Sequence, residues 1–467
     1  MDIFGILENP ENIKMNELGR INFVAQYFPF CSNKKDKVSQ QQLIDLDNYL
    51  SSSDKLIRES LLYIHIPYCL TICSFCSCDR IHLPPGKMED TLDRYLSKIF
   101  MEIEYYSHKK FIQDLTINHI HIGGGSPSLL SESQIKMLFA KIKKAFRVSS
   151  NVMLNFEGEA RTLINESKLK TLKDLGIPRV SFGVQSFDKE VRNLCNLRPT
   201  MKQITNLVEM LKKLEMNVNI DLMYGLPGQD ISVLKNDLKL AKEMGVDSLD
   251  FYRNVTYSSL PIHRDLRHSH PEIFDEKRKF DMYSEAVDRL EEFGYSAVTD
   301  EVFCRDSTKY CSIKQLPCKS GDERANIIGI GFGSFSWIGK YNLRNMHDPR
   351  YSHNVSNGFG PYLRAHEMSL DDEYTYMGIK GLGCGLIVSK ADSYFPGFYK
   401  KYSVLINFLI EKGYVVDNGK SLEMTKKGLK HHYLIQLSFL NDEELNRSQR
   451  FTLDNVWRES QLEEIIS

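Results

Sequence analysis

Short apolar runs rich in β-branched residues alternate with longer stretches of helical periodicity between residues 61 and 252. This alternation is typical of βα units that build a parallel sheet. In one intervening segment, apolar residues recur at i, i+3, i+4 and i+7 from Ile135, and Ser131 with Gln134 forms a capping box at its start. The pattern predicts six strands, at 61–66, 117–122, 152–157, 178–183, 218–223 and 247–252.

Six βα units predict an α/β fold with an open, incomplete barrel, a partial (β/α)6 relative of the TIM barrel. A doubly wound sheet would also satisfy the pattern. We assign residues 58–300 to this core and the polar residues 1–57 to an N-terminal arm. Because the alternation stops after about residue 300, residues 301–400 are assigned to a barrel extension and connecting region.

Residues 401–467 predict a mainly helical C-terminal domain that resembles a winged helix. An apolar helix over 402–410 is followed by two strand-like pieces around Asn418-Gly419, a pair that favours a tight hairpin, and by a helical segment from 426. The formal net charge of −1 and the pI near 6.9 lack the basic bias of nucleic-acid-binding proteins. We therefore expect this domain to cover the barrel, and no nucleic acid to be bound.

The composition is that of a soluble globular chain, with 42% hydrophobic and 26% charged residues. No window approaches the roughly 18 to 20 uninterrupted apolar residues of a membrane helix, and no signal peptide opens the chain. The sequence predicts a cytoplasmic monomer that acts without a membrane.

Three cysteines, Cys69, Cys73 and Cys76, follow the first predicted strand with C-x3-C-x2-C spacing. Thiolates at such spacing are typical ligands of an iron–sulfur cluster. Since a [4Fe–4S] cubane normally takes four thiolates, three protein ligands would leave one iron open to a small molecule. The C-x-C spacing of Cys78 is tight for another corner of the same cube, so we place Cys78 outside the ligand set.

Two other uses of the cysteines are open at this point. A zinc site would need a second pair, which Cys304, Cys311 and Cys318 could supply at wider spacing. A disulfide framework would need a higher density than ten cysteines in 467 residues. Reduced thiols with one metal site are the simplest interpretation.

Glycines and polar residues lie at the carboxyl ends of the predicted strands. The second strand is followed by GGGSP at 123–127, the third ends on Glu157, the fourth runs into Gln185, and the fifth carries Asp221 before YGLPG. Ligands of α/β sheets and barrels bind at this rim, which we therefore predict to be the active site. The sequence contains no phosphate-binding P-loop, no G-x-S-x-G nucleophile elbow and no H-E-x-x-H zinc motif.

The assembled motifs resemble the radical S-adenosylmethionine (SAM) enzymes, and within them the oxygen-independent coproporphyrinogen oxidase-like branch. The resemblance rests on YIHIPYC-x3-C-x-F-C-x-C, GGGSPS, VSFGVQSFD and NIDLMYGLPGQ, and covers about residues 60–340. It implies that Cys69, Cys73 and Cys76 hold a [4Fe–4S] cluster whose open iron chelates SAM. One electron, from a flavodoxin- or ferredoxin-type donor, would then cleave SAM to methionine and a 5′-deoxyadenosyl radical.

The resemblance also implies contacts for two SAM molecules. The first would be contacted by Tyr63, Gly124, Glu157 and Phe335. The second would be held by Phe75, Gly125, Ser126, Gln185, Asp221 and Val255. We add Arg198 to the cofactor-binding residues, although it stands one position beyond the family arginine, where this chain has Leu197.

Members of this branch perform several activities. Oxidases decarboxylate propionates of a tetrapyrrole, methyltransferases use a second SAM as methyl donor, and some members are haem chaperones. The CSCDR segment resembles the oxidases, and Cys78 is assigned a catalytic role with substrate protons or hydrogen atoms. The segments FEGEARTL and GVDSLDFY are more similar to the methyltransferases.

We therefore expect a radical SAM enzyme that performs C-methylation or cyclopropane formation on an unsaturated or tetrapyrrole-like small molecule. Oxidative decarboxylation of coproporphyrinogen III and haem chaperoning are the alternatives.

Overall fold

The computed structural model describes residues 38–53, 59–256, 260–306, 325–347, 349–384, 386 and 388–441. Most of the predicted N-terminal arm, together with Cys311 and Cys318, lies outside these residues. Of the arm, the description includes helix α4 (Gln40–Leu50), which Ser39 and Gln42 cap at its start.

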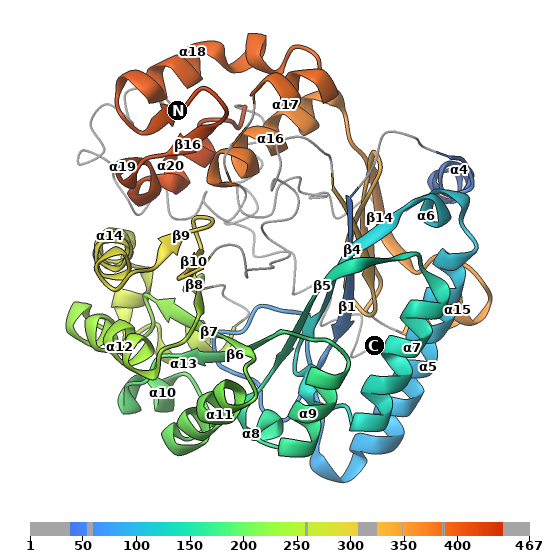
Figure 1. The fold of residues 1–467 in the computed structure, drawn as a ribbon, viewed down its shortest axis with the longest axis horizontal. Coiled ribbons are helices and arrows are strands. Elements are labelled where there is room, and N and C mark those ends of the chain that lie inside the picture. Colours follow the sequence, from blue (N-terminus) through green and yellow to red (C-terminus); the bar gives the residue numbers. More distant parts are fainter. Residues whose placement is uncertain are drawn as a thin grey trace.

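Twelve strands of the described chain form one sheet, in the order β14-β13-β12-β11-β1-β4-β5-β6-β7-β8-β10-β9. Its six central strands pair in parallel. They are β1 (Glu59–Ile66), β4 (Thr116–Gly124), β5 (Val148–Gly158), β6 (Arg179–Gln185), β7 (Asn217–Tyr224) and β8 (Ser248–Arg253). All six predicted strands are confirmed. The sheet curves into an open barrel with the connecting helices along its outer side, as the sequence predicted (Figure 1).

The connecting helices present apolar faces to the sheet. In α7 (Glu132–Ala145) the buried residues include Ile135, Leu138 and Phe139, and the predicted capping box between Ser131 and Gln134 is formed. Each fully buried side chain of this size stabilises the fold by about 1.5–3 kcal/mol. The other elements between β1 and β8 are β2 (Tyr68–Cys69), β3 (Ile81–His82), η2 (Pro85–Lys87), α5 (Met88–Ser107), α6 (Lys110–Asp114), η3 (Pro127–Leu129), α8 (Ala160–Leu163), α9 (Glu166–Asp174), α10 (Lys189–Leu194), α11 (Met201–Lys213) and α12 (Ile231–Met244).

The sheet continues at both edges beyond the predicted strands. Strand β11 (Asn326–Ile330) pairs in parallel with β1, and β12 (Phe335–Ile338), β13 (Tyr341–Asn345) and β14 (Tyr362–Glu367) follow in antiparallel order. At the other edge, antiparallel β10 (Val302–Cys304) and β9 (Ser296–Ala297) extend β8. These strands add hairpins to a parallel core. The remaining elements of this part of the chain are α13 (Pro261–Leu266), η4 (Pro271–Phe274), α14 (Glu276–Glu292) and α15 (Pro349–Ser356).

The C-terminal part builds a hydrophobic core that is separate from the main core of the barrel and that includes Trp337 of β12. Helix α18 (Phe398–Glu411), hairpin β15 (Val415–Asp417) and β16 (Leu422–Met424), and helix α19 (Lys426–Lys430) confirm the predicted helix, hairpin and helix. With α16 (Leu370–Cys384), α17 (Val388–Tyr394) and α20 (His432–Leu437), they form a module beside α14 and β9 (Figure 1). Among the described helices, none is long and apolar enough to cross a membrane.

Candidate active site

The segment from Pro67 to His82 crosses the carboxyl end of β1 and carries the three predicted cluster ligands. Backbone hydrogen bonds tie it to the glycine turn after β4: Gly125 N–H donates to the Ile66 carbonyl and Ser126 N–H to that of Tyr68, each at 2.7 Å. A Cβ on Gly125 would lie 2.9 Å from Cys69 Sγ. The turn after β4 therefore needs glycine here because it packs directly against the cysteine segment.

The donor set fits a [4Fe–4S] cluster. The thiols of Cys69, Cys73 and Cys76 are half-buried, and Ser126 Oγ lies 3.7 Å from Cys69 Sγ. Burial raises the pKa of Cys69 to about 11 and raises that of Cys73 further, so these thiols must release protons when they become ligands. Among the described residues no three His, Cys, Asp or Glu side chains are grouped to hold a single ion. A cubane does not need such a group, because each thiolate binds a different iron.

The other cysteines that the sequence left open are placed as follows. Cys304 is buried on β10, and strands β4 to β8 separate it from β1. Cys78 is exposed, two residues beyond Cys76. A hydrogen bond with the Cys76 sulfur raises the pKa of the Cys78 thiol. Cys78 therefore lies at the predicted site, and its catalytic role stays a prediction.

Three of the residues predicted to contact the first SAM, Tyr63, Gly124 and Glu157, make hydrogen bonds near the carboxyl ends of their strands. Glu157 at the end of β5 pairs with His121 at 2.6 Å and accepts from Gly124 N–H at 3.2 Å. Burial opposes ionisation of Glu157, but His121 and the Gly124 amide hold its pKa below the ordinary value. The Tyr63 hydroxyl lies 2.9 Å from His65 Nδ1. A carboxylate that is ionised in this position can accept from an ammonium or a hydroxyl group.

Gln185 and Asp221 are predicted to contact the second SAM. Gln185 ends strand β6, and Asp221 lies on the neighbouring strand β7. Gln185 has a positive φ of 67°, and its Oε1 is buried without a hydrogen-bond partner in the described part of the chain. Asp221 accepts from Ser181 Oγ at 3.3 Å. Burial, together with the neighbouring Asp250 and Glu157 carboxylates, raises the pKa of Asp221 well above its ordinary value. A ligand that donates hydrogen bonds would satisfy both side chains.

The remaining predicted contacts are placed less uniformly. Gly125 and Ser126 lie in the turn after β4, Phe75 is half-buried in the cysteine segment, and Val255 is half-buried in the loop after β8. Phe335 begins β12 at the opposite side of β1, with 48% of its surface exposed.

Arg198 is exposed, and its place among the cofactor-binding residues stays a prediction. Leu197 instead packs with Phe75 against a small apolar cluster that includes Met223 and Leu226. The buried arginine of this segment is Arg192, whose guanidinium donates to backbone carbonyls.

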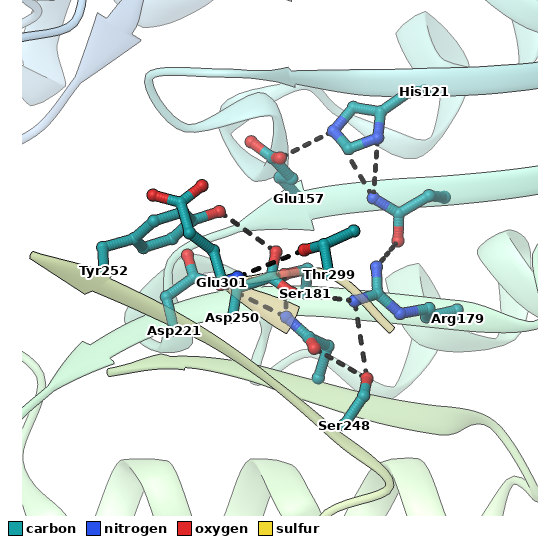
Figure 2. A network of polar contacts seen from close by, with 12 residues as sticks. His121, Glu157, Arg179, Ser181, Asp221, Ser248, Asp250, Tyr252, Thr299 and Glu301 are labelled. Carbon is teal, nitrogen blue, oxygen red and sulfur yellow. Dashed lines mark hydrogen bonds and ion pairs between the residues drawn. The ribbon is translucent and has the colours of Figure 1, made fainter. Parts of the chain in front are cut away.

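The sequence analysis missed a polar network inside the barrel (Figure 2). Arg179 donates to Asn155 Oδ1 at 2.6 Å and lies 3.6 Å from Asp250, and Asn155 contacts His121 Nδ1 at 3.1 Å. Tyr252 donates to Asp250 at 3.1 Å. Arg179 also donates to Ser248, which contacts Asn219, and Asn219 donates to Asp221 at 3.2 Å, so the network connects the Glu157 and Asp221 positions. In the sequence these residues are visible only as polar positions inside otherwise apolar strands. Their contacts become apparent only when the strands lie side by side in the barrel.

Comparison with known proteins defines the family. Residues 63–241 match the model of the radical SAM superfamily. A heme chaperone HemW from Buchnera aphidicola subsp. Acyrthosiphon pisum is 30% identical over 291 residues, which cover 60% of this chain and 71% of the relative. This chain belongs to the radical SAM superfamily.

Other relatives also match most of this chain. Anaerobilin synthase from Escherichia coli O157:H7 is 24% identical over 318 residues, 67% of this chain and 69% of the relative. Oxygen-independent coproporphyrinogen III oxidase from Salmonella typhimurium is 26% identical over 392 residues, 79% and 83% of the two chains. The structure of Escherichia coli coproporphyrinogen III oxidase (HemN), 23% identical, shares the fold with a TM-score of 0.73 over 89% of this chain and 97% of that one.

Membership in this superfamily identifies a [4Fe–4S] cluster and SAM as the cofactors. The chain is therefore a radical SAM enzyme of the group that includes coproporphyrinogen oxidases, HemW and anaerobilin synthase.

Proposed function

We propose that the chain uses two SAM molecules, one as the source of the 5′-deoxyadenosyl radical and one as methyl donor, to methylate or cyclopropanate a tetrapyrrole-like small molecule. The observation that carries this proposal is the arrangement around Asp221. Gln185 Oε1 is buried without a hydrogen-bond partner in the described chain, and Asp221 lies on the adjacent strand β7. A second ligand with ammonium or hydroxyl donors would complete these acceptors.

Cys69, Cys73 and Cys76 would hold the cluster, which would supply the electron for cleavage of SAM. The protein itself must bind SAM and the substrate, orient them and exclude water from the site. Glu157, oriented by His121, is suited to hold hydroxyl or ammonium groups of the first SAM, and the glycine turn at 123–125 permits close approach of its backbone. Asp221 performs the corresponding binding for the second.

Similarity to relatives supports the substrate class. The names of three relatives that match this chain refer to anaerobilin, coproporphyrinogen III and heme. A tetrapyrrole is consequently the first compound class to test. We further propose a flavodoxin- or ferredoxin-type electron donor and a monomeric, cytoplasmic enzyme.

Oxidative decarboxylation of coproporphyrinogen III is the second candidate. One observation in its favour is that a relative named coproporphyrinogen III oxidase matches 79% of this chain. A second is the position of Cys78 beside Cys76. Haem carriage is the third candidate, on the similarity to HemW.

Product analysis separates these candidates. The anaerobically reconstituted, reduced protein is incubated with SAM and, in parallel reactions, with haem or coproporphyrinogen III. S-adenosylhomocysteine formed together with 5′-deoxyadenosine and a methylated product is the expected result. If carbon dioxide and 5′-deoxyadenosine form without S-adenosylhomocysteine, the reaction is decarboxylation and not methyl transfer. Stoichiometric haem binding without SAM consumption would establish the chaperone role instead.

A further inference from the structure

Asp79 and Arg344 join the cysteine segment to the sheet extension, and neither is among the predicted cofactor contacts. Asp79 directly follows Cys78, whereas Arg344 lies on β13, 265 residues later. Arg344 Nη2 and Asp79 Oδ2 are 2.6 Å apart, and their side chains are only 4% and 20% exposed. An ion pair this buried holds its geometry, because separating it would leave charges without partners in a poorly solvated place.

Arg344 also fixes the ring of Phe335. The two residues face each other across the β12–β13 hairpin, and the guanidinium lies 4.5 Å from the ring centroid. A guanidinium is planar and can stack on an aromatic face while its edge binds a carboxylate. The Phe335 ring is therefore oriented by Arg344, although nearly half of its surface remains exposed to a ligand.

Asp79 reaches Tyr63 through its backbone. Its carbonyl accepts from His65 Nε2 at 2.9 Å, which leaves His65 Nδ1 to accept from the Tyr63 hydroxyl at 2.9 Å. The Asp79 side chain packs on Gly333, where φ is +62° and a Cβ would collide with the carboxylate. The turn between β11 and β12 is thereby closed onto the cysteine segment. One continuous set of contacts runs from Tyr63 through Asp79 and Arg344 to Phe335.

We propose that Asp79 and Arg344 are positioning residues for the first SAM. The pair fixes the Tyr63 hydroxyl and the Phe335 ring relative to the cysteine segment, so that the contacts to SAM from the barrel and from the cluster are made in one geometry. The inference rests on SAM binding at this rim, which the proposed function also requires. It adds two residues on which the affinity for SAM depends without their touching it.

Arg344→Gln and Arg344→Lys test the pair in the full-length, anaerobically reconstituted protein. Iron content and the dissociation constant for SAM, from equilibrium dialysis without reductant, are measured with no turnover. We expect a full cluster in both variants and a SAM dissociation constant raised roughly tenfold. Arg344→Lys keeps the positive charge but not the planar stack. Its SAM dissociation constant should therefore lie nearer to that of Arg344→Gln than to that of the native protein. The control is Lys340→Gln, which breaks the exposed Lys340–Glu367 pair beside the same hairpin and should leave SAM binding unchanged.

Asp79→Asn is a milder second variant in case Arg344 variants fold poorly, since it keeps the side-chain shape and one acceptor. It should weaken SAM binding by a smaller factor, and the double variant Asp79→Asn/Arg344→Gln should bind SAM no worse than Arg344→Gln alone. Unchanged affinity in Asp79→Asn and Arg344→Gln, or factors that multiply in the double variant, would overturn the proposal. Failure of the native, fully loaded protein to bind SAM would overturn the proposed function instead.

Discussion

Cys76 and Cys78 are neighbouring thiols for which we expect different roles, and they can be compared directly. We predict that Cys76→Ser abolishes SAM cleavage and leaves an incomplete cluster, because three thiolates are the only proposed protein ligands. Cys78→Ser should retain the visible absorbance and the iron content, because the exposed Cys78 thiol is placed outside the ligand set. Iron analysis after anaerobic reconstitution checks both variants. Equal loss of iron from the two would make Cys78 a ligand.

Asp221 supplies the test of the second SAM. Burial and two nearby carboxylates raise the pKa of Asp221, so Asp221→Asn resembles the neutral acid and should not lower the free energy of unfolding at neutral pH. Binding of one SAM equivalent should nevertheless weaken, by about 1.5–3 kcal/mol, because the positive charge of bound SAM favours the ionised form of Asp221, and asparagine cannot supply the resulting charge-assisted hydrogen bond. Equilibrium dialysis counts the bound SAM, with and without substrate.

Asp237→Asn is the matched control for Asp221→Asn. Asp237 is also buried, but it accepts from Ser186 Oγ and Phe187 N–H at 2.8 Å and serves the backbone after β6. Its substitution should lower stability and leave the number of bound SAM molecules unchanged. A native stoichiometry of one SAM, even with substrate present, would remove the second site.

At the residue scale, the sequence predicted which residues lie at the carboxyl ends of the strands, but not the side chains that orient them. The cysteine spacing, the glycine turn and Glu157 were all recognisable as local motifs. His121, Asn155 and Arg179 were not, because each contributes only after three strands have been brought into register. Arg344 is further removed still, since its partner Asp79 lies 265 residues away in the chain.

At the scale of elements, local periodicity predicted the strands that alternate with helices and missed those that do not. Strands β12, β13 and β14 follow one another as hairpins, so no helical spacing announces them. The parallel pairing of β11 with β1 joins segments at opposite ends of the barrel sequence, for example Leu62 with Ile328. Register between such distant segments is set by burial of the finished sheet, which no window of sequence contains.

Helix α5 carries a buried carboxylate that secures this extension. Glu102 is fully buried and accepts from Gly331 N–H at 2.8 Å, Asn345 Nδ2 at 2.7 Å and the Tyr351 hydroxyl at 2.5 Å. Burial raises the pKa of Glu102 to about 8 despite these donors. The folded state therefore binds a proton more tightly than the unfolded state, and this contribution to stability is lost as the pH rises through about 8.

We predict that Glu102→Gln removes this pH dependence. In the native protein the free energy of unfolding should decline between about pH 5 and pH 8, by up to about 1.4 kcal/mol per pH unit from this group. Thermal unfolding at fixed cluster content across that range measures it. Glu104→Gln, on the same helix but paired with Lys141 at the surface, should keep the native slope. A Glu102→Gln protein with the native slope would assign the decline to other groups.

At the scale of the whole molecule, the C-terminal module docks on α14 through both charged and aromatic contacts. Asp288 pairs with Lys426 and Lys430 at 2.7 Å each, and His432 lies against the Tyr283 ring with centroids 4.7 Å apart. The sequence predicted the elements of this module from its hairpin turn and helical periodicity. It could not identify α14 as the docking surface, because that depends on side chains brought together from two separate cores.

If the module covers the barrel, loosening it should expose the radical to solvent. We predict that Asp288→Ala, which breaks both ion pairs at a cost of about 1 kcal/mol, raises the ratio of 5′-deoxyadenosine formed to substrate converted while iron content and SAM binding stay native. Asp281→Ala is the control, since it breaks only the Lys277–Asp281 pair within α14 and leaves the module's contacts intact. The ratio is measured by quantifying both products in the same anaerobic reaction. An unchanged ratio in Asp288→Ala, with weaker docking shown by faster limited proteolysis than in Asp281→Ala, would mean that shielding of the radical comes from the barrel itself.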